Sequence, residues 1–222
     1  MNPDSPKPDS PNPDRWTPPD PVLARPIRTE RLVVDPFTLD DAGPLFEIIQ
    51  AMRPTAEPWL DWVHTQHRSL EETTRWVADQ ALRLSDPGFR SLAMVIREPD
   101  SRQIFGGAGV YDLDPDTRSC STGYWIRPDR RGHAFAGEAC RAVISWCLRP
   151  QPEGLGLSRV RLFCSADNSA SRRVLEKLGL PFEMHQRRQD FVAGFGLTDR
   201  LGWGVLADEW DCERHTMAAT AG

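Results

Sequence analysis

The chain has 222 residues, of which 39% are hydrophobic and 27% are charged, and its formal net charge is −5. This composition is typical of a soluble globular protein, and the mild acidity gives no basic field of the kind that indicates nucleic-acid binding. Without an apolar run of the roughly 20 residues that span a bilayer, or the apolar segment of a signal peptide, the sequence predicts a cytoplasmic protein that contacts neither membrane nor nucleic acid.

The first 26 residues carry nine of the chain's 20 prolines, interleaved with aspartate and serine. A segment of this kind buries too little apolar surface to offset the entropy of ordering it, so residues 1–26 are predicted to be a mobile, partly polyproline-like tail. A single domain is predicted over residues 27–210, followed by a flexible C-terminal tail over 211–222. The five cysteines lie far apart without a Cys-x-x-Cys pair, so we expect neither a disulfide framework nor a metal site.

Hydrophobic patterning predicts one mixed α/β domain. Helix-start signals occur at Thr38–Asp41, at the capping box Ser69–Glu72 and at Asn168, and Gly179 is predicted to end the last helix. A further helix is expected over 132–148, with Cys140 and Cys147 on its apolar face. The predicted strands cover residues 27–37, 91–97, 103–113, 120–126, 158–165, about 182–192 and about 201–207.

The segment 127–138 is a basic, glycine-containing turn between a predicted strand and a predicted helix. The free N–H groups and the positive potential at a helix start suit a phosphate or pyrophosphate group, although simple helix capping explains many such turns. The segment lacks the Gly-Lys-Ser/Thr ending of a P-loop and the three glycines of a dinucleotide fingerprint. About 40 residues later, a second helix start carries Asn168 and Ser171.

In combination, the stretch Gly123–Ala139 and the pattern Asn168-x-x-Ser171 up to Gly179 resemble the GNAT superfamily of N-acetyltransferases. The resemblance is to its branch of RimJ/RimL-type ribosomal-protein N-terminal acetyltransferases, which the segments Arg28–Val33 and Pro58–Trp62 resemble too, and it covers roughly residues 27–207. One departure is Ala134, which replaces the first spaced glycine of the family's loop. Its methyl group is expected to crowd a pyrophosphate unless its φ angle is negative.

The resemblance implies a central mixed, mostly antiparallel sheet of about seven strands that splays at the fourth, with about four flanking helices. Acetyl-CoA, the implied acetyl donor, is expected in that split. The implied contacts are the pantetheine arm with Trp125, Ile126, Arg127 and Asn168, the pyrophosphate with Arg131, Gly132, His133, Ala134, Phe135, Ala136 and Gly137, and the ribose phosphate with Arg172 or Arg173. For the two arginines, a solvated helix face is the alternative.

The implied reaction is direct acetyl transfer to a primary amine, which must lose a proton before it attacks. The backbone N–H of Ile126 is expected to polarise the acetyl oxygen, and Ser171 to donate to the departing thiolate, unless it only caps its helix. Asp190 is the predicted base. Its rivals are Glu57, Asp61 and His64, and each of these carboxylates and the imidazole could also be an ordinary surface group.

Trp59 and Trp62 are expected to wall the acceptor side, with a plain core role as the alternative. The resemblance favours the N-terminal amine of a protein as the acceptor. A small amine, such as an amino acid, polyamine or antibiotic, is the second hypothesis, and a CoA-binding sensor without turnover is the third. The sequence leaves a homodimer open.

Overall fold

The computed structural model describes residues 15–17, 25–56, 58–86 and 88–213. The strands in these ranges are β1 (Ile27–Arg28), β2 (Val33–Pro36), β3 (Leu92–Arg97), β4 (Ile104–Asp114), β5 (Ser119–Ile126), β6 (Arg159–Ser165), β7 (Phe182–Val192) and β8 (Gly196–Leu206). The α-helices are α1 (Ala42–Met52), α2 (Asp61–Thr65), α3 (Leu70–Arg83), α4 (Phe135–Leu148) and α5 (Ser169–Leu178), and the 3-10 helices are η2 (Leu39–Asp41), η3 (Arg53–Thr55) and η4 (Pro128–Arg130).

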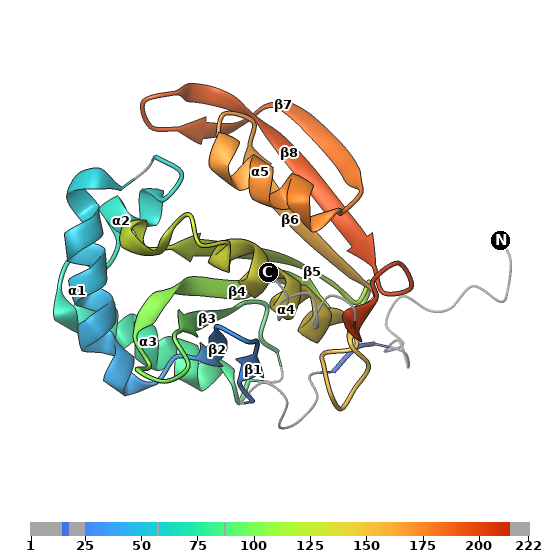
Figure 1. Cartoon of the computed structure of the whole chain (residues 1–222), viewed down its shortest axis with the longest axis horizontal. Coiled ribbons are helices and arrows are strands. Elements are labelled where there is room, and N and C mark those ends of the chain that lie inside the picture. Colours follow the sequence, from blue (N-terminus) through green and yellow to red (C-terminus); the bar gives the residue numbers. More distant parts are fainter. Residues whose placement is uncertain (1–14, 18–24, 57, 87, 214–222) are drawn as a thin grey trace, which may run out of the picture.

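The eight strands of these ranges form one sheet in the order β1-β2-β3-β4-β5-β6-β8-β7, and α1, α2 and α3 pack on one face of it while α4 and α5 pack on the other (Figure 1). The predicted mixed α/β fold is therefore confirmed. The predicted numbers of about seven strands and four helices differ from eight and five in the described ranges. The predicted first strand is broken by a turn between Thr29 and Leu32, and the short helix α2 was not expected.

Local signals explain where the helices begin and end. Ser69 Oγ accepts a hydrogen bond from the backbone N–H of Glu72 (3.1 Å), as the capping box predicts. The reciprocal half is wrong, because the Glu72 carboxylate accepts from the N–H groups of His67 and Arg68 rather than from that of Ser69. At the other end of the chain, Gly179 ends α5 with a φ of 75°, the left-handed conformation that glycine adopts without strain.

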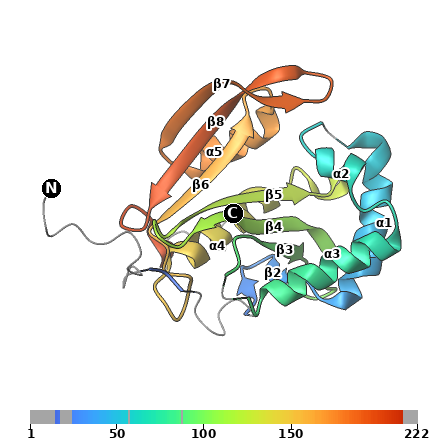
Figure 2. The same ribbon diagram turned by 180° about the vertical axis from the view of Figure 1, so that it is seen from behind.

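The sheet divides between β5 and β6. These two strands pair in parallel only from Ser119 to Ser121 on β5, whereas β4 stays paired with β5 as far as Ile126 and β6 stays paired with β8 as far as Ser165. Beyond the short parallel contact the two halves of the sheet separate, as Figure 2 shows. Because β5 is the fourth of the predicted strands, the predicted splay at the fourth strand is confirmed.

Two apolar clusters hold the sheet in place. The larger one packs α4 and α5 against one face, and it includes Cys140 and Cys147, which are 2% and 0% exposed, as expected of core residues. Burial raises the pKa of both thiols well above the ordinary range. The smaller cluster joins α1, α2 and α3 to the opposite face around Ile49, Val77 and Val95. The larger cluster therefore joins strands from both sides of the split, β2 to β5 as well as β6 and β8, on one face of the sheet.

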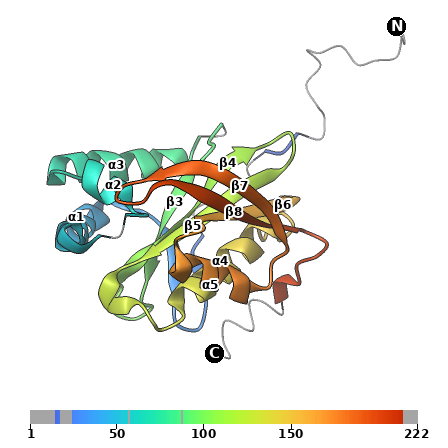
Figure 3. The ribbon, with the colours of Figure 1, turned by 90° about the horizontal axis from the view of Figure 1, so that it is seen from above.

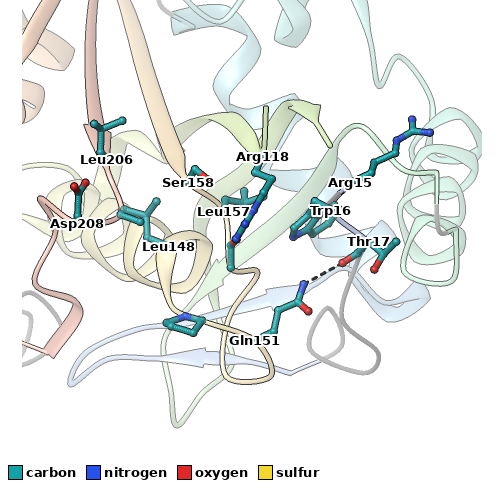
Figure 4. Close-up of a pocket in the computed structure, with 13 residues that line it drawn as sticks. Arg15, Trp16, Thr17, Arg118, Leu148, Gln151, Leu157, Ser158, Leu206 and Asp208 are labelled. Atoms are coloured by element: carbon teal, nitrogen blue, oxygen red, sulfur yellow. Dashed lines mark hydrogen bonds between the residues drawn. The ribbon is translucent and has the colours of Figure 1, made fainter. Parts of the chain in front are cut away.

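Part of the predicted N-terminal tail is packed on the domain. Trp16 is only 7% exposed, its indole N–H donates to the carbonyl of Leu155 (2.5 Å), and its backbone N–H donates to the carbonyl of Pro115 (3.0 Å). Gln151 Nε2 also donates to the carbonyl of Thr17 beside a cavity of about 640 Å³ (Figure 4). The prediction of a mobile tail is thus wrong at Trp16, and its remainder, residues 1–14 and 18–24, lies outside the described residues, as do residues 214–222 of the predicted C-terminal tail.

None of the helices in the described ranges is both long and apolar enough to cross a bilayer. Among the same residues, no group of three or more histidine, cysteine, aspartate or glutamate side chains is placed to hold a metal ion.

Candidate active site

A cavity of about 520 Å³ lies where β5 and β6 part, and we call it the split cavity. The predicted site residues that line it are Trp59, Trp125, Ile126, Arg131, Gly132, Ala134, Phe135, Ala136, Gly137, Asn168, Ser171 and Arg173. Lining residues that sequence reasoning gave no role are Leu60, Tyr124, Arg130, Ala170, Val174 and Lys177. The structure thus brings together segments from four parts of the chain, including both motifs that carried the resemblance.

The edge of β5 that faces the split carries a free backbone donor. The N–H of Arg127 donates to the carbonyl of Phe105 on the β4 side (2.9 Å). Since successive N–H groups of a strand point to opposite edges, the N–H of Ile126 points away from β4. No strand in the described ranges pairs with that edge beyond Ser121, so this N–H is directed into the split cavity.

The first turn of α4 also opens into the split cavity. The first backbone bond of the helix runs from the N–H of Glu138 to the carbonyl of Ala134 (3.2 Å). The N–H groups of Phe135, Ala136 and Gly137 therefore precede the intrahelical pattern, and all three residues line the cavity. Arg131 Nε donates to the carbonyl of Ile126 (3.0 Å), which ties the loop before α4 to the end of β5. The arrangement can bind an anion at the positive end of the helix.

Ala134 adopts the left-handed conformation, with a φ of 63°. The methyl group was expected to be tolerated only if φ were negative. That condition is therefore not met. A left-handed residue with a Cβ costs about 1–2 kcal/mol relative to its relaxed state. This single departure from the family's loop is a strained position at the start of α4.

Replacing Ala134 with glycine is expected to raise the free energy of unfolding by up to about 1 kcal/mol, because glycine adopts positive φ angles freely. Ala136→Gly is the matched control, since Ala136 is the second residue of α4 and has no such strain. That change is expected to lower the free energy of unfolding by about 0.5–1 kcal/mol. Urea denaturation measures both variants, and equal destabilisation by the two glycines would contradict the prediction.

Four cationic side chains, those of Arg130, Arg131, Arg173 and Lys177, line the split cavity. Arg130 lies over the ring of Phe105, 4.8 Å from its centroid, which holds the guanidinium at the cavity wall. Of the two arginines considered for a phosphate, Arg173 lines the cavity. Arg172 instead forms an ion pair with Glu176 at 2.8 Å, with both side chains about half exposed.

Two other predicted cofactor residues lie beside the split cavity without lining it. The Arg127 side chain pairs with Asp129 at 2.7 Å. The exposed His133 stacks on Phe135 with ring centroids 5.6 Å apart, and its carbonyl accepts from Arg31. The implied cofactor contacts of both residues stay predictions.

Ser171 and Tyr124 form a pair at the α5 side of the cavity. Asn168 Oδ1 accepts from the backbone N–H of Ser171 (3.0 Å), so Asn168 caps the helix. The hydroxyl of Ser171 lies 3.2 Å from that of Tyr124, and its hydrogen-bonded partner is thus on β5 rather than in the helix backbone. Burial, aided by the nearby Cys140, raises the pKa of Tyr124, which keeps its phenol protonated. The alternation of β5 could have indicated Tyr124, since it lies two residues before Ile126 and shares its face.

Asp190, the predicted base, lies on β7 and does not line the split cavity. Both of its carboxylate oxygens accept from the guanidinium of Arg200 on β8. Its role as a base stays a prediction. Among the rivals, Asp61 and His64 are exposed on α2, and Glu57 lies outside the described residues.

The two tryptophans predicted for the acceptor side line different cavities. Trp59 lines the split cavity and contacts Phe195, with ring centroids 4.8 Å apart. Phe195 belongs to the turn between β7 and β8, so this contact joins the α1–α2 connection to the hairpin that extends toward α2 in Figure 3. Trp62 does not line the split cavity, but its ring lies 5.6 Å from that of Trp125. Of the two tryptophans, Trp59 therefore lines the split cavity and Trp62 does not.

Glu138, at the end of the basic segment, is the buried anchor of the loop before α4. It is 3% exposed, and its carboxylate accepts from Thr29 Oγ1 (2.5 Å) and from Nε and Nη2 of Arg31 (2.8 and 2.5 Å). Arg31 also donates to the carbonyl of His133 (3.2 Å) and lies over the ring of Phe135. We call these contacts the Arg31–Glu138 clamp. Sequence reasoning noted the Arg28–Val33 segment but assigned it no role.

The chain is similar to a known protein family and to a curated protein. A model of the acetyltransferase (GNAT) domain family matches residues 31–181. The uncharacterized N-acetyltransferase YoaA of Bacillus subtilis (strain 168) is 27% identical over 157 residues, which are 71% of this chain and 83% of that protein.

Solved structures share the fold at lower sequence identity. The RimL ribosomal L7/L12 alpha-N-protein acetyltransferase in complex with coenzyme A has a TM-score of 0.73 at 17% identity, over 84% of this chain and 100% of that one. Mycobacterium smegmatis RimJ in complex with a CoA-disulfide has a TM-score of 0.72 at 22% identity, over 88% of this chain and 93% of that one.

Proposed function

The chain belongs to the acetyltransferase (GNAT) domain family, and on that premise we propose that it transfers the acetyl group of acetyl-CoA to the N-terminal amine of a protein. The observation that carries the proposal is the position of the α4 N-terminus, which opens into the cavity created by the parting of β5 and β6. One cavity thus joins an anion site, a free strand edge and the hydroxyl of Ser171.

The residues of the split cavity fit the charged parts of the donor. Acetyl-CoA supplies an acetyl group activated as a thioester, attached to a pantetheine arm, a pyrophosphate and a ribose phosphate. The N–H groups of Phe135, Ala136 and Gly137, with Arg131, suit the pyrophosphate. Arg173 and Lys177 at the α5 wall suit the further phosphate, and the free edge of β5 suits the amide groups of the arm.

The chain's own groups then serve the reaction. The N–H of Ile126 donates to the acetyl oxygen as negative charge develops there. With the Tyr124 hydroxyl donating to Ser171 Oγ, the proton of Ser171 is free to point at the sulfur as the carbon–sulfur bond breaks. The attacking amine must first give up a proton, and Asp190 is the predicted acceptor of that proton.

The choice of a protein amine rests on the kind of relative that the fold resembles. RimL is described as acting on the alpha-N position of ribosomal protein L7/L12, and RimJ shares the fold over most of this chain. A small amine is the second candidate, favoured by the spermidine N-acetyltransferase chimera that has a TM-score of 0.64 with this chain. Both candidates use the same donor and the same cavity.

Release of CoA, followed with peptides that have free N-termini and with small amines, tests the proposal. We expect peptides with free N-termini to be acetylated and peptides with blocked N-termini to be inactive. Turnover of small amines alone would move the acceptor to the second candidate, and tight acetyl-CoA binding without any turnover would favour a sensor. Failure to bind acetyl-CoA would overturn the proposal altogether.

Arg131→Ala is expected to weaken acetyl-CoA binding by about 1.5–3 kcal/mol, or roughly 10- to 150-fold in Kd, because a charge-assisted contact to phosphate is lost. Arg172→Ala is the matched control, since Arg172 pairs with Glu176 on the exposed face of α5. Its Kd is expected to stay within about twofold of the parent value. Calorimetric titration measures both, and an unchanged Kd for Arg131→Ala would refute the assigned contact.

A further inference from the structure

A second cavity lies on the other side of Trp125. Its volume is about 370 Å³, and it lies between the sheet and the helices α1, α2 and α3. Five aromatic side chains line it, those of Phe37, Trp62, Trp76, Tyr111 and Trp125, and we call it the aromatic cavity. Trp125 also lines the split cavity, so the two cavities share one wall.

The three indoles of the aromatic cavity are only partly buried. Trp62, Trp76 and Trp125 each keep intermediate exposure, although all of them pack against the apolar cluster on this face. Trp62 lies 5.6 Å from Trp125, and Trp76 lies 5.1 Å from Phe37, between ring centroids. Apolar surface left uncovered in a concave site is typical of a place where an apolar group binds.

Two polar side chains in the wall of this cavity, those of Gln80 and Arg83, are already engaged by the protein. Gln80 Oε1 accepts from the N–H of Ala93 (3.0 Å). Arg83 donates through Nη1 to Ser91 Oγ (2.9 Å) and through Nε to Asp79 (2.9 Å), which neutralises its charge. These groups offer little to a polar ligand, because each already has a partner in the fold.

The charge in the aromatic cavity is equally low. His67 is 3% exposed, and its Nδ1 lies 3.2 Å from Thr73 Oγ1. Burial lowers the pKa of His67, although the negative charge of Glu72 acts to raise it. The imidazole is therefore neutral near pH 7. No aspartate or glutamate is among the described residues that line the cavity. A cationic group placed there would lose its hydration without gaining a counter-charge.

We propose that the aromatic cavity holds the side chain of the acceptor's first residue, and that the enzyme favours a large, uncharged side chain at that position. The inference rests on the proposed function, because the reacting amine must stand at the split cavity. An acceptor whose amine lies beside Trp125 can extend its side chain past this shared wall. Phenylalanine, leucine and methionine fit such a site, whereas alanine leaves it unfilled and lysine brings a charge into it.

Peptides that differ only in their first residue test this specificity. We expect kcat/KM to be at least about tenfold higher for peptides that begin with phenylalanine or leucine than for peptides that begin with alanine or lysine. The reason is that the larger apolar side chains bury several more methylene groups in the cavity. Ala93→Leu, which fills the cavity from β3, is expected to lower the phenylalanine-to-alanine ratio at least about fivefold. Leu82→Ala, 73% exposed on α3, is the control and should leave the ratio unchanged.

Binding without turnover separates this inference from the proposed function. Phenylalaninamide and alaninamide are titrated calorimetrically onto the protein with CoA bound, and tighter binding of phenylalaninamide is expected. If it binds more tightly but no peptide is acetylated, the cavity assignment stands and the proposed function falls. If peptides are acetylated without preference for a large first residue, or if the two amides bind equally, the cavity assignment is overturned.

Discussion

Ser171→Ala is expected to lower kcat by about 100-fold while KM for acetyl-CoA changes little, since a proton donor to the leaving thiolate acts mainly in the transition state. Ser171 lies at the cavity wall with its hydroxyl 3.2 Å from that of Tyr124, and its backbone N–H, not its hydroxyl, is held by Asn168. The helix cap therefore survives the change. Steady-state kinetics at saturating acceptor measure the two parameters.

Ser169→Ala is the matched control, because Ser169 is exposed at the first position of α5 and does not line the split cavity. A double-mutant cycle with Tyr124→Phe sharpens the test. If Tyr124 acts by orienting Ser171, Tyr124→Phe lowers kcat in the parent protein but has little further effect in the Ser171→Ala background. Equal activity of Ser171→Ala and Ser169→Ala would rule out the donor role.

Glu138→Ala is expected to lower the free energy of unfolding by about 3–5 kcal/mol, because it removes a buried carboxylate and leaves Arg31 and Thr29 without their partner. Glu138 is 3% exposed, whereas the Arg31 side chain is 34% exposed and regains some hydration. The lower end of that range is therefore the expectation. Chemical denaturation measures it.

The same change is expected to weaken acetyl-CoA binding, since the clamp holds the loop before α4 through the carbonyl of His133. Glu138→Gln keeps the side-chain volume and tests the charge alone, in case the alanine variant fails to fold. Glu71→Ala removes an exposed ion pair with Arg75 and should leave both stability and binding nearly unchanged. If the fully folded Glu138→Gln variant bound acetyl-CoA as tightly as the parent protein, the clamp would have no part in shaping the loop.

Short-range signals in the sequence predicted the local structure well. Ser69 and Asn168 cap their helices and Gly179 ends one, because each of these effects operates between residues three or four positions apart. The two motifs at the starts of α4 and α5 could likewise be identified from the sequence. Their convergence on one cavity followed from the resemblance, and the structure places both of them there.

Besides the local errors at Glu72 and at α2, the contacts that the sequence did not predict join residues that are distant in sequence. Trp16 looked like part of a proline-rich tail, but its indole reaches Leu155, 139 residues away. Glu138 and Arg31 are 107 residues apart, and Tyr124 and Ser171 are 47 apart. No local pattern encodes such a contact, since it exists only once the sheet has brought the segments together.

By itself, the sequence predicted most of the helices and strands in their order, and the resemblance carried by residues 123–139 and 168–179 indicated the family. The helix and strand predictions depend on backbone propensity and side-chain periodicity, which are local properties of the chain. Only the tertiary structure decided that Ala134 is left-handed, that Arg173 rather than Arg172 lines the split cavity, and that Trp125 stands between two cavities. Those features depend on which side chains meet when β5 and β6 part, and that geometry is set by packing across the whole fold.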